Sequence, residues 1–258
     1  MVNLDWEGKN TRFQKSKKKY LDCNFQVIKK FHSNNSNKIN QFSNKACNEL
    51  FWGDNSQVIN YLLKESNKRI DLIYLDPPFF SGSDYSLTIK SKNNEKTQVA
   101  YKDNWNKNFD EYLEMIYQRL ILMKEILAST GLIFVHLDWH ASHYIKVIMD
   151  EIFGKNNFIN NIVWYYYNKY SASKTNLPRA HDDILVYSKS KNYTFNELRI
   201  PRDKPKKQLK RKMVNGVLKN AKDKEGKVIY RIVKDKKMDD VWKIPCMQPA
   251  SKQWTGYP

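Results

Sequence analysis

The run Asp71-Leu72-Ile73-Tyr74-Leu75-Asp76-Pro77-Pro78-Phe79 joins a short apolar segment to a rigid turn. The unbroken apolar residues 72–75 are typical of a strand that is covered on both faces, as in a parallel sheet. In open α/β sheets, ligands bind at the carboxyl ends of the strands. The sequence therefore predicts a functional site at residues 76–79, directly after a buried strand.

The tetrapeptide Asp76-Pro77-Pro78-Phe79 carries groups that suit a planar molecule bearing an amino group. The two prolines restrain the backbone and remove two N–H donors, and the Pro77 carbonyl is left free as an acceptor. The Asp76 carboxylate is a second acceptor, and the Phe79 ring offers a flat apolar face. The alternative is a strand that ends in a rigid turn, with Asp76 capping a nearby helix. The full tetrapeptide after an apolar strand favours the functional interpretation.

The segments after this tetrapeptide alternate between helix and strand patterns. Residues 80–108 lack clear periodicity and are expected to form a long loop. The expected elements are a helix over 113–127 that stops at Gly131, strands over 132–135, 162–164 and 184–187, and a helix over 141–153 closed by Gly154. Such alternation predicts an α/β fold.

The composition narrows the class of protein. The chain has 258 residues, of which 41% are hydrophobic, so it can form one large α/β domain or one domain with an inserted module. The sequence contains no apolar run of about eighteen residues, so no membrane span is predicted. The lysine-rich N-terminus is unlike a secretory signal. The scattered cysteines Cys23, Cys47 and Cys246 fit a reducing cytoplasm rather than a disulfide framework or a zinc cluster.

Positive charge is concentrated in one window. The net charge is +18, and residues 202–237 hold 15 Lys and Arg against 4 Asp and Glu, a net of +11. Such an excess attracts a polyanion, and nucleic acid is the commonest one in a cell. A solvated, flexible arm is the alternative. The chain from residue 189 is poorly periodic, with one short strand expected over 228–233.

The chain resembles the DNA methyltransferases that modify adenine N6 or cytosine N4, specifically their permuted beta group. The resemblance covers roughly residues 50–190, with a last trace at 254–258. The segments that carry it are residues 51–55, 71–79, the loop with Gly82, Asp84 and Tyr85, and residues 101–105, 134–138, 149–154, 161–164 and 181–189.

The resemblance implies the catalytic half of a Rossmann-like methyltransferase sheet that uses S-adenosyl-L-methionine, with a basic target-recognition insertion. The family continues with a Thr-Gln-Lys-Pro element and a Phe-x-Gly-x-Gly cofactor loop, and neither is found up to Pro258. The expected organisation is a polar, partly helical or loosely ordered extension over 1–48, an incomplete catalytic domain over 49–195, a target-recognition region over 196–250 and the start of the cofactor half over 251–258.

The resemblance also implies a mechanism. The target base leaves the duplex before its amino group is reached. Asp76 and the Pro77 carbonyl would accept hydrogen bonds from that amino group, Pro78 would keep the turn rigid, and Phe79 would stack on the base. The methyl group would move in line, helped by positioning and electrostatics. Aspartate at the first position favours adenine N6 over cytosine N4.

The remaining candidate residues surround this centre. Beside Asp76, Tyr257 and Pro258 are expected to bind part of the cofactor. The residues expected to bind DNA are Tyr85, Tyr166, Tyr167, Lys169, Lys174, Arg179, Lys206, Lys207, Arg211 and Lys212, since aromatic and basic side chains suit unstacked bases and phosphates. No metal is expected: we interpret the cluster of His136, Asp138, His140 and His143 as packing or polar lining. Asp54 is expected to cap a helix, with a cofactor contact as the alternative.

These inferences lead to a site-specific DNA methyltransferase of a bacterial restriction-modification or orphan system, located in the cytoplasm. Double-stranded DNA is the expected partner, with a cognate restriction endonuclease as a further candidate and no membrane partner. The alternative is a catalytically silent DNA-binding fragment, or one half of a split enzyme that needs a second polypeptide for the cofactor half. Methylation of RNA or of a protein glutamine ranks below both.

Overall fold

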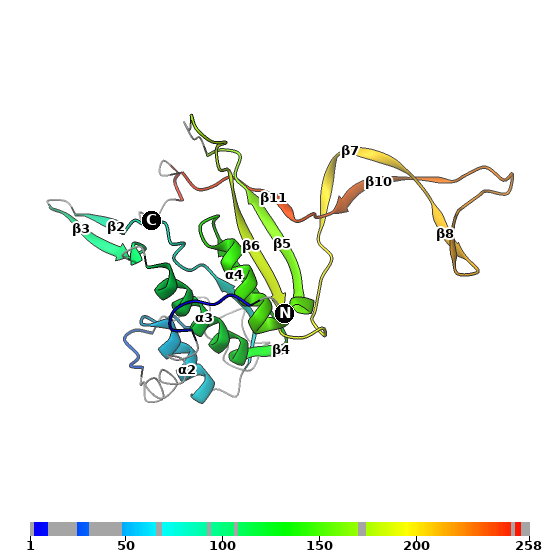
Figure 1. Ribbon diagram of the computed structural model, residues 1–258. Coiled ribbons are helices and arrows are strands. Elements are labelled where there is room, and N and C mark those ends of the chain that lie inside the picture. Colours follow the sequence, from blue (N-terminus) through cyan, green and yellow to red (C-terminus); the bar gives the residue numbers. More distant parts are fainter. Residues whose placement is uncertain are drawn as a thin grey trace. The chain divides into compact units, whose positions relative to one another are not determined.

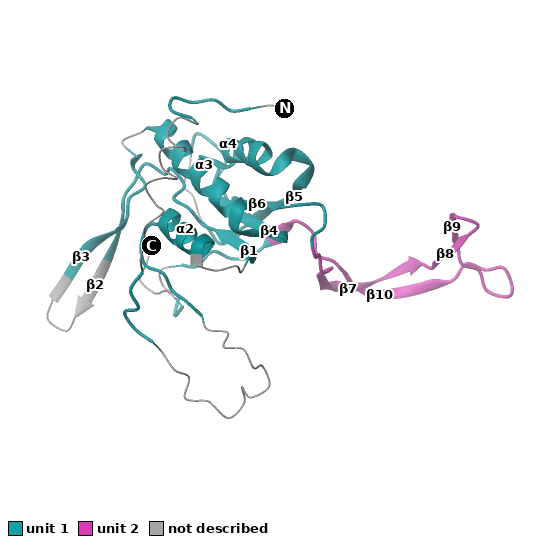
Figure 2. Ribbon diagram, turned by 90° about the horizontal axis from the view of Figure 1, so that it is seen from below, with its two compact units in different colours: residues 1–193, 243–258 teal, residues 194–242 magenta. Residues whose placement is uncertain are grey.

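The protein consists of two compact units, which Figure 2 shows in different colours. Unit 1 comprises residues 1–193 and 243–258, and unit 2 comprises residues 194–242. The computed structural model describes residues 3–9, 25–30, 48–65, 69–91, 94–105, 108–169, 174–248 and 251–253. The target-recognition region is expected to begin near residue 195 and to end near residue 250, whereas unit 2 begins at residue 194 and ends at residue 242.

A five-stranded sheet has the order β1-β4-β6-β5-β11, and its first four strands belong to unit 1 (Figure 1). Its strands are β1 (Ile70–Leu75), β4 (Leu127–Leu137), β5 (Phe158–Tyr165), β6 (His181–Ser188) and β11 (Val241–Lys243). β1 and β4 are parallel, whereas β6 runs antiparallel to both β4 and β5. The predicted α/β sheet is confirmed. The parallel arrangement suggested by residues 72–75 holds only for the first pair, and Leu72 and Tyr74 of β1 are exposed rather than covered.

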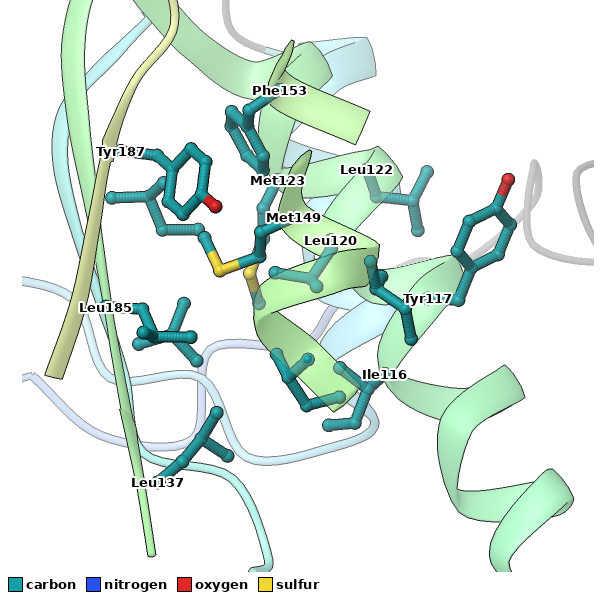
Figure 3. Close-up of a cluster of buried hydrophobic side chains, with 14 of the residues drawn as sticks. Ile116, Tyr117, Leu120, Leu122, Met123, Leu137, Met149, Phe153, Leu185 and Tyr187 are labelled. Carbon is teal, nitrogen blue, oxygen red and sulfur yellow. The ribbon is translucent and has the colours of Figure 1, made fainter. Parts of the chain in front are cut away.

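Helices cover one face of this sheet. They are α2 (Asn55–Glu65), α3 (Phe109–Ile126) and α4 (Ser142–Met149), followed by a π-helical turn η3 (Asp150–Gly154) and a 3-10 turn η4 (Lys155–Asn157). None of the described helices is long and apolar enough to span a membrane. Figure 3 shows Leu137 of β4 and Leu185 and Tyr187 of β6 facing side chains of α3 and α4. Because strand side chains alternate between faces, His136 of β4 and Asp182 of β6 lie on the other face.

One predicted helix end is wrong, at Gly131, and the other is confirmed at Gly154, which has a φ of 93°. Gly131 does not stop a helix but lies inside β4, where a Cβ atom would come within 2.8 Å of the Leu127 Cγ atom. α3 already ends at Ile126, and the next residue, Leu127, pairs with Ile70 of β1. The helix expected over 141–153 ends its regular turns at Met149 and continues as η3 up to Gly154.

The expected loop over 80–108 contains a β-hairpin. Strands β2 (Tyr85–Ser91) and β3 (Asn94–Tyr101) pair in antiparallel register. In β2 the apolar residues Tyr85, Leu87 and Ile89 alternate with polar ones, which is the period of two that is typical of a strand. The expectation of a loop without clear periodicity is therefore wrong for this segment.

The N-terminal extension is not wholly loose. Trp6 is buried in the core, where its indole nitrogen donates to the Glu114 carboxylate at 3.0 Å and its ring meets Tyr117 edge to face. Lys9 pairs with Glu151 at 2.7 Å. Residues 3–9 are thus an integral part of the packing around α3, within the segment expected to be a polar, partly helical or loosely ordered extension.

Unit 2 consists of β-ribbons, where only one short strand was expected. Strands β7 (Arg199–Leu209) and β10 (Tyr230–Lys237) pair in antiparallel register, and β8 (Arg211–Val214) pairs with β9 (Val217–Asn220). Most side chains along β7 are exposed. The high density of lysine and arginine conceals the strand pattern, because exposed strands do not need alternating apolar residues.

Candidate active site

The candidate site lies where the parallel strands β1 and β4 end. Leu75 of β1 pairs with Val135 of β4, so Asp76 and His136 are next to each other across the two strands. The Asp76 carboxylate is 3.2 Å from His136 Nδ1, and its side chain is 57% exposed. The predicted position of the tetrapeptide, directly after a strand at the carboxyl edge of the sheet, is confirmed.

A second carboxylate approaches the same histidine from β6. Asp182 lies 3.6 Å from His136 Nε2, on the opposite side of the imidazole. The pairing explains this position, because His136 is opposite Ile184, and Asp182 shares a strand face with Ile184. Trp164 is the cross-strand neighbour of Asp182 on β5, and its ring lies 5.3 Å from the His136 ring.

Aromatic rings line the side of the tetrapeptide. Phe79 meets His136 edge to face, with ring centroids 5.1 Å apart. The Tyr166 hydroxyl donates to Asp182 at 3.1 Å, and burial together with that carboxylate raises the pKa of Tyr166. Burial, Asp76 and Asp182 likewise raise the pKa of Tyr74, so both tyrosines stay neutral donors around neutral pH.

A buried carboxylate holds the backbone after the tetrapeptide. Asp103 is 1% exposed and accepts hydrogen bonds from the Phe80 and Ser81 amides, the Ser81 hydroxyl and the Trp105 indole. Phe80 has a φ of 62°, a conformation that costs energy for a bulky side chain. The amide contacts from Asp103 therefore stabilise a strained residue next to Phe79.

Helix α3 contacts the tetrapeptide through the side chain of Tyr112. The Tyr112 hydroxyl donates to the Pro78 carbonyl at 2.8 Å, and burial, followed by Asp103, raises the pKa of Tyr112. Among the described residues, no donor bonds the Pro77 carbonyl. Pro77 is a buried residue, and the hydrogen-bonding capacity of its carbonyl is not used by any described residue.

The expected DNA-binding residues near residue 170 fall into different environments. Tyr166 is 4% exposed and forms part of the packed site, so its predicted surface contact with DNA does not fit this structure. Tyr167 is exposed, with Lys243 over its ring, and Lys169 lies over the Tyr166 ring. Arg179 stacks on the exposed Trp139 with its guanidinium 3.7 Å from the ring centroid.

Tyr85 belongs to the β2–β3 hairpin, where it stacks on Tyr101 with ring centroids 4.7 Å apart. Its hydroxyl donates to Ser81, so it is tied to the backbone after the tetrapeptide. Lys174 is exposed. Tyr257 and Pro258, expected to contact the cofactor, lie outside the described residues.

The basic candidates of unit 2 are all exposed. Lys206 and Lys207 lie on β7, and Lys207 sits over the Tyr230 ring at 4.5 Å. Arg211 and Lys212 of β8 line an open concavity together with other cationic side chains of the β8–β9 hairpin. This arrangement suits phosphate binding.

The histidine cluster considered as a metal set does not assemble. Asp138 bonds His140 at 2.6 Å, whereas His136 is engaged with other carboxylates. Among the residues that the structure describes, no three ligating side chains gather around one point. Asp54 accepts from the Ser56 amide at 2.9 Å, which confirms its role as a helix cap.

Sequence reasoning missed two residues of the site. Asp103 lies within the segment 101–105 that carried the family resemblance, and Asp182 lies within 181–189, but neither was assigned a role. Spacing gives no signal for them, because each is far along the chain from Asp76. Burial in the fold distinguishes Asp103, since a buried carboxylate is unusual, and proximity to His136 distinguishes Asp182.

Comparisons with known proteins identify the family of the chain. The family model described as DNA methylase matches residues 70–258. The type II methyltransferase M.EcaI of Enterobacter cloacae is 40% identical over 149 residues, which are 58% of this chain and 31% of that protein. The Mod subunit of the type III restriction-modification enzyme StyLTI of Salmonella typhimurium is 31% identical over 163 residues, covering 57% of this chain and 25% of the relative.

Among solved structures, the M1.HpyAVI–SAM complex matches with a TM-score of 0.35 at 18% identity, covering 55% of each chain. The matched regions cover 31% of M.EcaI and 25% of the StyLTI Mod subunit, so the chain spans about a third or less of the length of these curated relatives.

Proposed function

Since the chain belongs to the N6/N4 DNA methylase family, we propose that it forms the catalytic half of a site-specific DNA methyltransferase. The enzyme would transfer a methyl group from S-adenosyl-L-methionine to the exocyclic amine of a flipped base, with adenine N6 as the favoured target. The observation that carries the proposal is the exposed Asp76 carboxylate at the end of β1, next to the Phe79 ring and to the Pro77 carbonyl, to which no described residue donates.

These residues fit an amino group on a planar ring. An amine has two N–H donors, and Asp76 and the Pro77 carbonyl provide one acceptor for each. With both hydrogens held, the nitrogen lone pair has a defined direction. Phe79 supplies a face for stacking, and contacts from His136, Tyr112 and Asp103 keep this region of the chain rigid.

Few of the residues proposed to bind the cofactor are among those that the structure describes. S-adenosyl-L-methionine supplies the electrophilic methyl group when it is bound. Of the residues proposed to contact it, only Asp76 is described, and its partly exposed carboxylate fits a place between base and cofactor. Asp76 is also a carboxylate within reach of the proton that the amine gives up when it gains a methyl group.

Unit 2 would supply affinity for DNA. Its exposed Lys206, Lys207, Arg211 and Lys212 would contact phosphates, and such contacts release counterions and weaken with salt. Tyr167, Lys169 and Arg179 of unit 1 add exposed or half-exposed basic and aromatic groups. Relatives named as parts of restriction-modification systems support a cognate restriction endonuclease as a partner of the whole enzyme.

A split enzyme is the second candidate. β1 is an edge strand, and its apolar residues Leu72 and Tyr74 are exposed. An open apolar edge next to the site is a surface on which further strands can pair. The cofactor half would dock there, either as part of the same polypeptide or as a second one.

The test is Asp76→Ala in the protein that contains this chain. Loss of one transition-state hydrogen bond to a positioned group costs on the order of 100-fold or more in rate, so methyl transfer to duplex DNA should fall at least that far. Asp71→Ala, which removes an exposed carboxylate from the same strand, is the matched control. Nucleoside mass spectrometry distinguishes N6-methyladenine from N4-methylcytosine. Undiminished transfer by Asp76→Ala would rule out the proposed role.

A further inference from the structure

His136 lies at the centre of the site, although none of the chemistry proposed above uses it. Its side chain is 8% exposed, and it contacts both members of the tetrapeptide that are expected to touch the base. The Asp76 carboxylate is 3.2 Å from Nδ1, and the Phe79 ring is 5.1 Å from the imidazole centroid. A buried ring that touches both groups is well placed to set their relative orientation.

The two ring nitrogens face two different carboxylates. Nδ1 faces Asp76 and Nε2 faces Asp182 at 3.6 Å, and both nitrogens are buried without a hydrogen bond of standard geometry among the described residues. A neutral imidazole has one N–H, so one carboxylate would face a nitrogen lone pair. Only the doubly protonated ring presents a donor to each carboxylate.

We propose that His136 is a positioning residue that acts as an imidazolium, with Asp182 as its anchor and Asp76 and Phe79 as the groups it orients. The inference rests on the proposed function, which places the base against Asp76 and Phe79. One Asp76 oxygen is directed toward His136, and the other, which no described residue bonds, would accept from the amino group of the base.

The surroundings of His136 favour the charged ring. Burial opposes the charge, but Asp182 and Asp76 outweigh it and raise the pKa of His136 to about 9. The other titratable groups facing this cluster are Tyr74 on β1 and Tyr166 after β5, which donates to the second Asp182 oxygen at 3.1 Å. Both tyrosines have raised pKa values, so neither adds a negative charge near pH 7.

The first measurement does not depend on catalysis. Long-range ¹H–¹⁵N NMR of the whole chain reports the protonation of each histidine, and His136→Gln assigns the signal. We expect the His136 ring to carry protons on both nitrogens at pH 7 and to titrate near pH 9. Asp182→Asn should lower the midpoint by about 1 pH unit or more, because it removes an attractive charge. A midpoint near the ordinary value of about 6.5 would overturn the proposal.

The second measurement is methyl transfer by the full enzyme. His136→Gln should lower kcat about 10- to 100-fold, the range expected from a misplaced catalytic group, while the KM for DNA changes less than about 3-fold. Activity of the wild type should decline above pH 9, and the variant should lose that decline. His143→Gln, the same change at an exposed histidine of α4, is the control and should leave kcat unchanged.

The outcomes separate the two proposals. If Asp76→Ala retains full activity, the proposed function fails, while the NMR titration still decides whether His136 is an imidazolium held by two carboxylates. If Asp76→Ala is inactive and His136→Gln retains the wild-type kcat and pH profile, the positioning role fails alone. Should His136→Gln not fold, Asp182→Asn provides the same kinetic comparison.

Discussion

Replacing Asp103 by asparagine should destabilise unit 1 strongly, because this buried carboxylate is the shared acceptor for the backbone after the tetrapeptide. One oxygen accepts from the Phe80 amide and the Trp105 indole, and the other accepts from the Ser81 amide and hydroxyl. Asparagine retains one acceptor oxygen and turns its NH₂ group toward one pair of donors. The Ser81 hydroxyl can rotate and accept from that NH₂, but the Ser81 amide cannot.

The magnitude follows from these hydrogen bonds. A hydrogen bond to a charged group contributes about 1.5–3 kcal/mol, and a buried donor left without an acceptor costs about 1–3 kcal/mol. One amide bond is broken and the remaining bonds no longer have charge assistance, so we expect a decrease of about 2–4 kcal/mol in the free energy of unfolding. With a urea dependence of about 2 kcal/mol per molar, the midpoint should fall by about 1–2 M.

Urea unfolding followed by circular dichroism and tryptophan fluorescence measures this change. Asp71→Asn removes the same charge from an exposed position on β1 and should change stability by less than about 0.5 kcal/mol. If Asp103→Asn unfolds at the same urea concentration as the Asp71→Asn control, Asp103 is not the structural acceptor described here.

Three further predictions concern other parts of the molecule. The raised pKa of His136 contributes stability that is fully present below the unfolded value of about 6.5 and is lost as the pH rises through about 9. Between pH 6 and 9.5 the free energy of unfolding of the wild type should therefore fall by about 2–3 kcal/mol more than that of His136→Gln. Urea unfolding measures this difference, and parallel pH curves for the two proteins would contradict it. Trp6→Phe removes the indole donor to the buried Glu114 carboxylate and should cost about 1–3 kcal/mol in the same unfolding assay, whereas an unchanged midpoint would show that residues 3–9 contribute little. Replacing Lys206 and Lys207 by alanine should reduce the slope of log affinity against log salt by about 0.9 for each DNA phosphate that the variant no longer neutralises, measured by fluorescence anisotropy with a DNA duplex, and equal slopes would mean that other residues bind the phosphates.

Much of the site could be predicted from local sequence. The apolar run before Asp76 identifies β1, and the two prolines that follow it mark the rigid turn at the carboxyl edge of the sheet. The helical spacing of apolar residues identifies most of α3. These features need only neighbouring residues, because strand and helix periodicities and proline geometry are local properties. The basic window over 202–237 is likewise a property of composition.

The partners of the site came only from the tertiary structure. His136, Asp182 and Trp164 share one face because β4, β6 and β5 pair in a particular antiparallel register, and pairing between distant strands leaves no mark in local periodicity. The long ribbon of unit 2 has few apolar residues along β7, so backbone hydrogen bonds define it rather than burial. A polar loop and a polar hairpin therefore look alike along the chain, and long-range pairing distinguishes them.

Local sequence therefore determines where the tetrapeptide turns, and the fold determines which groups surround it. Pro77 and Pro78 set the turn themselves, since proline restricts its own backbone. The charge that faces Asp76 depends on His136, which strand pairing places 3.2 Å from Asp76 and 3.6 Å from the second carboxylate, Asp182. Electrostatic interactions depend on distance in space, and only the folded chain determines that distance.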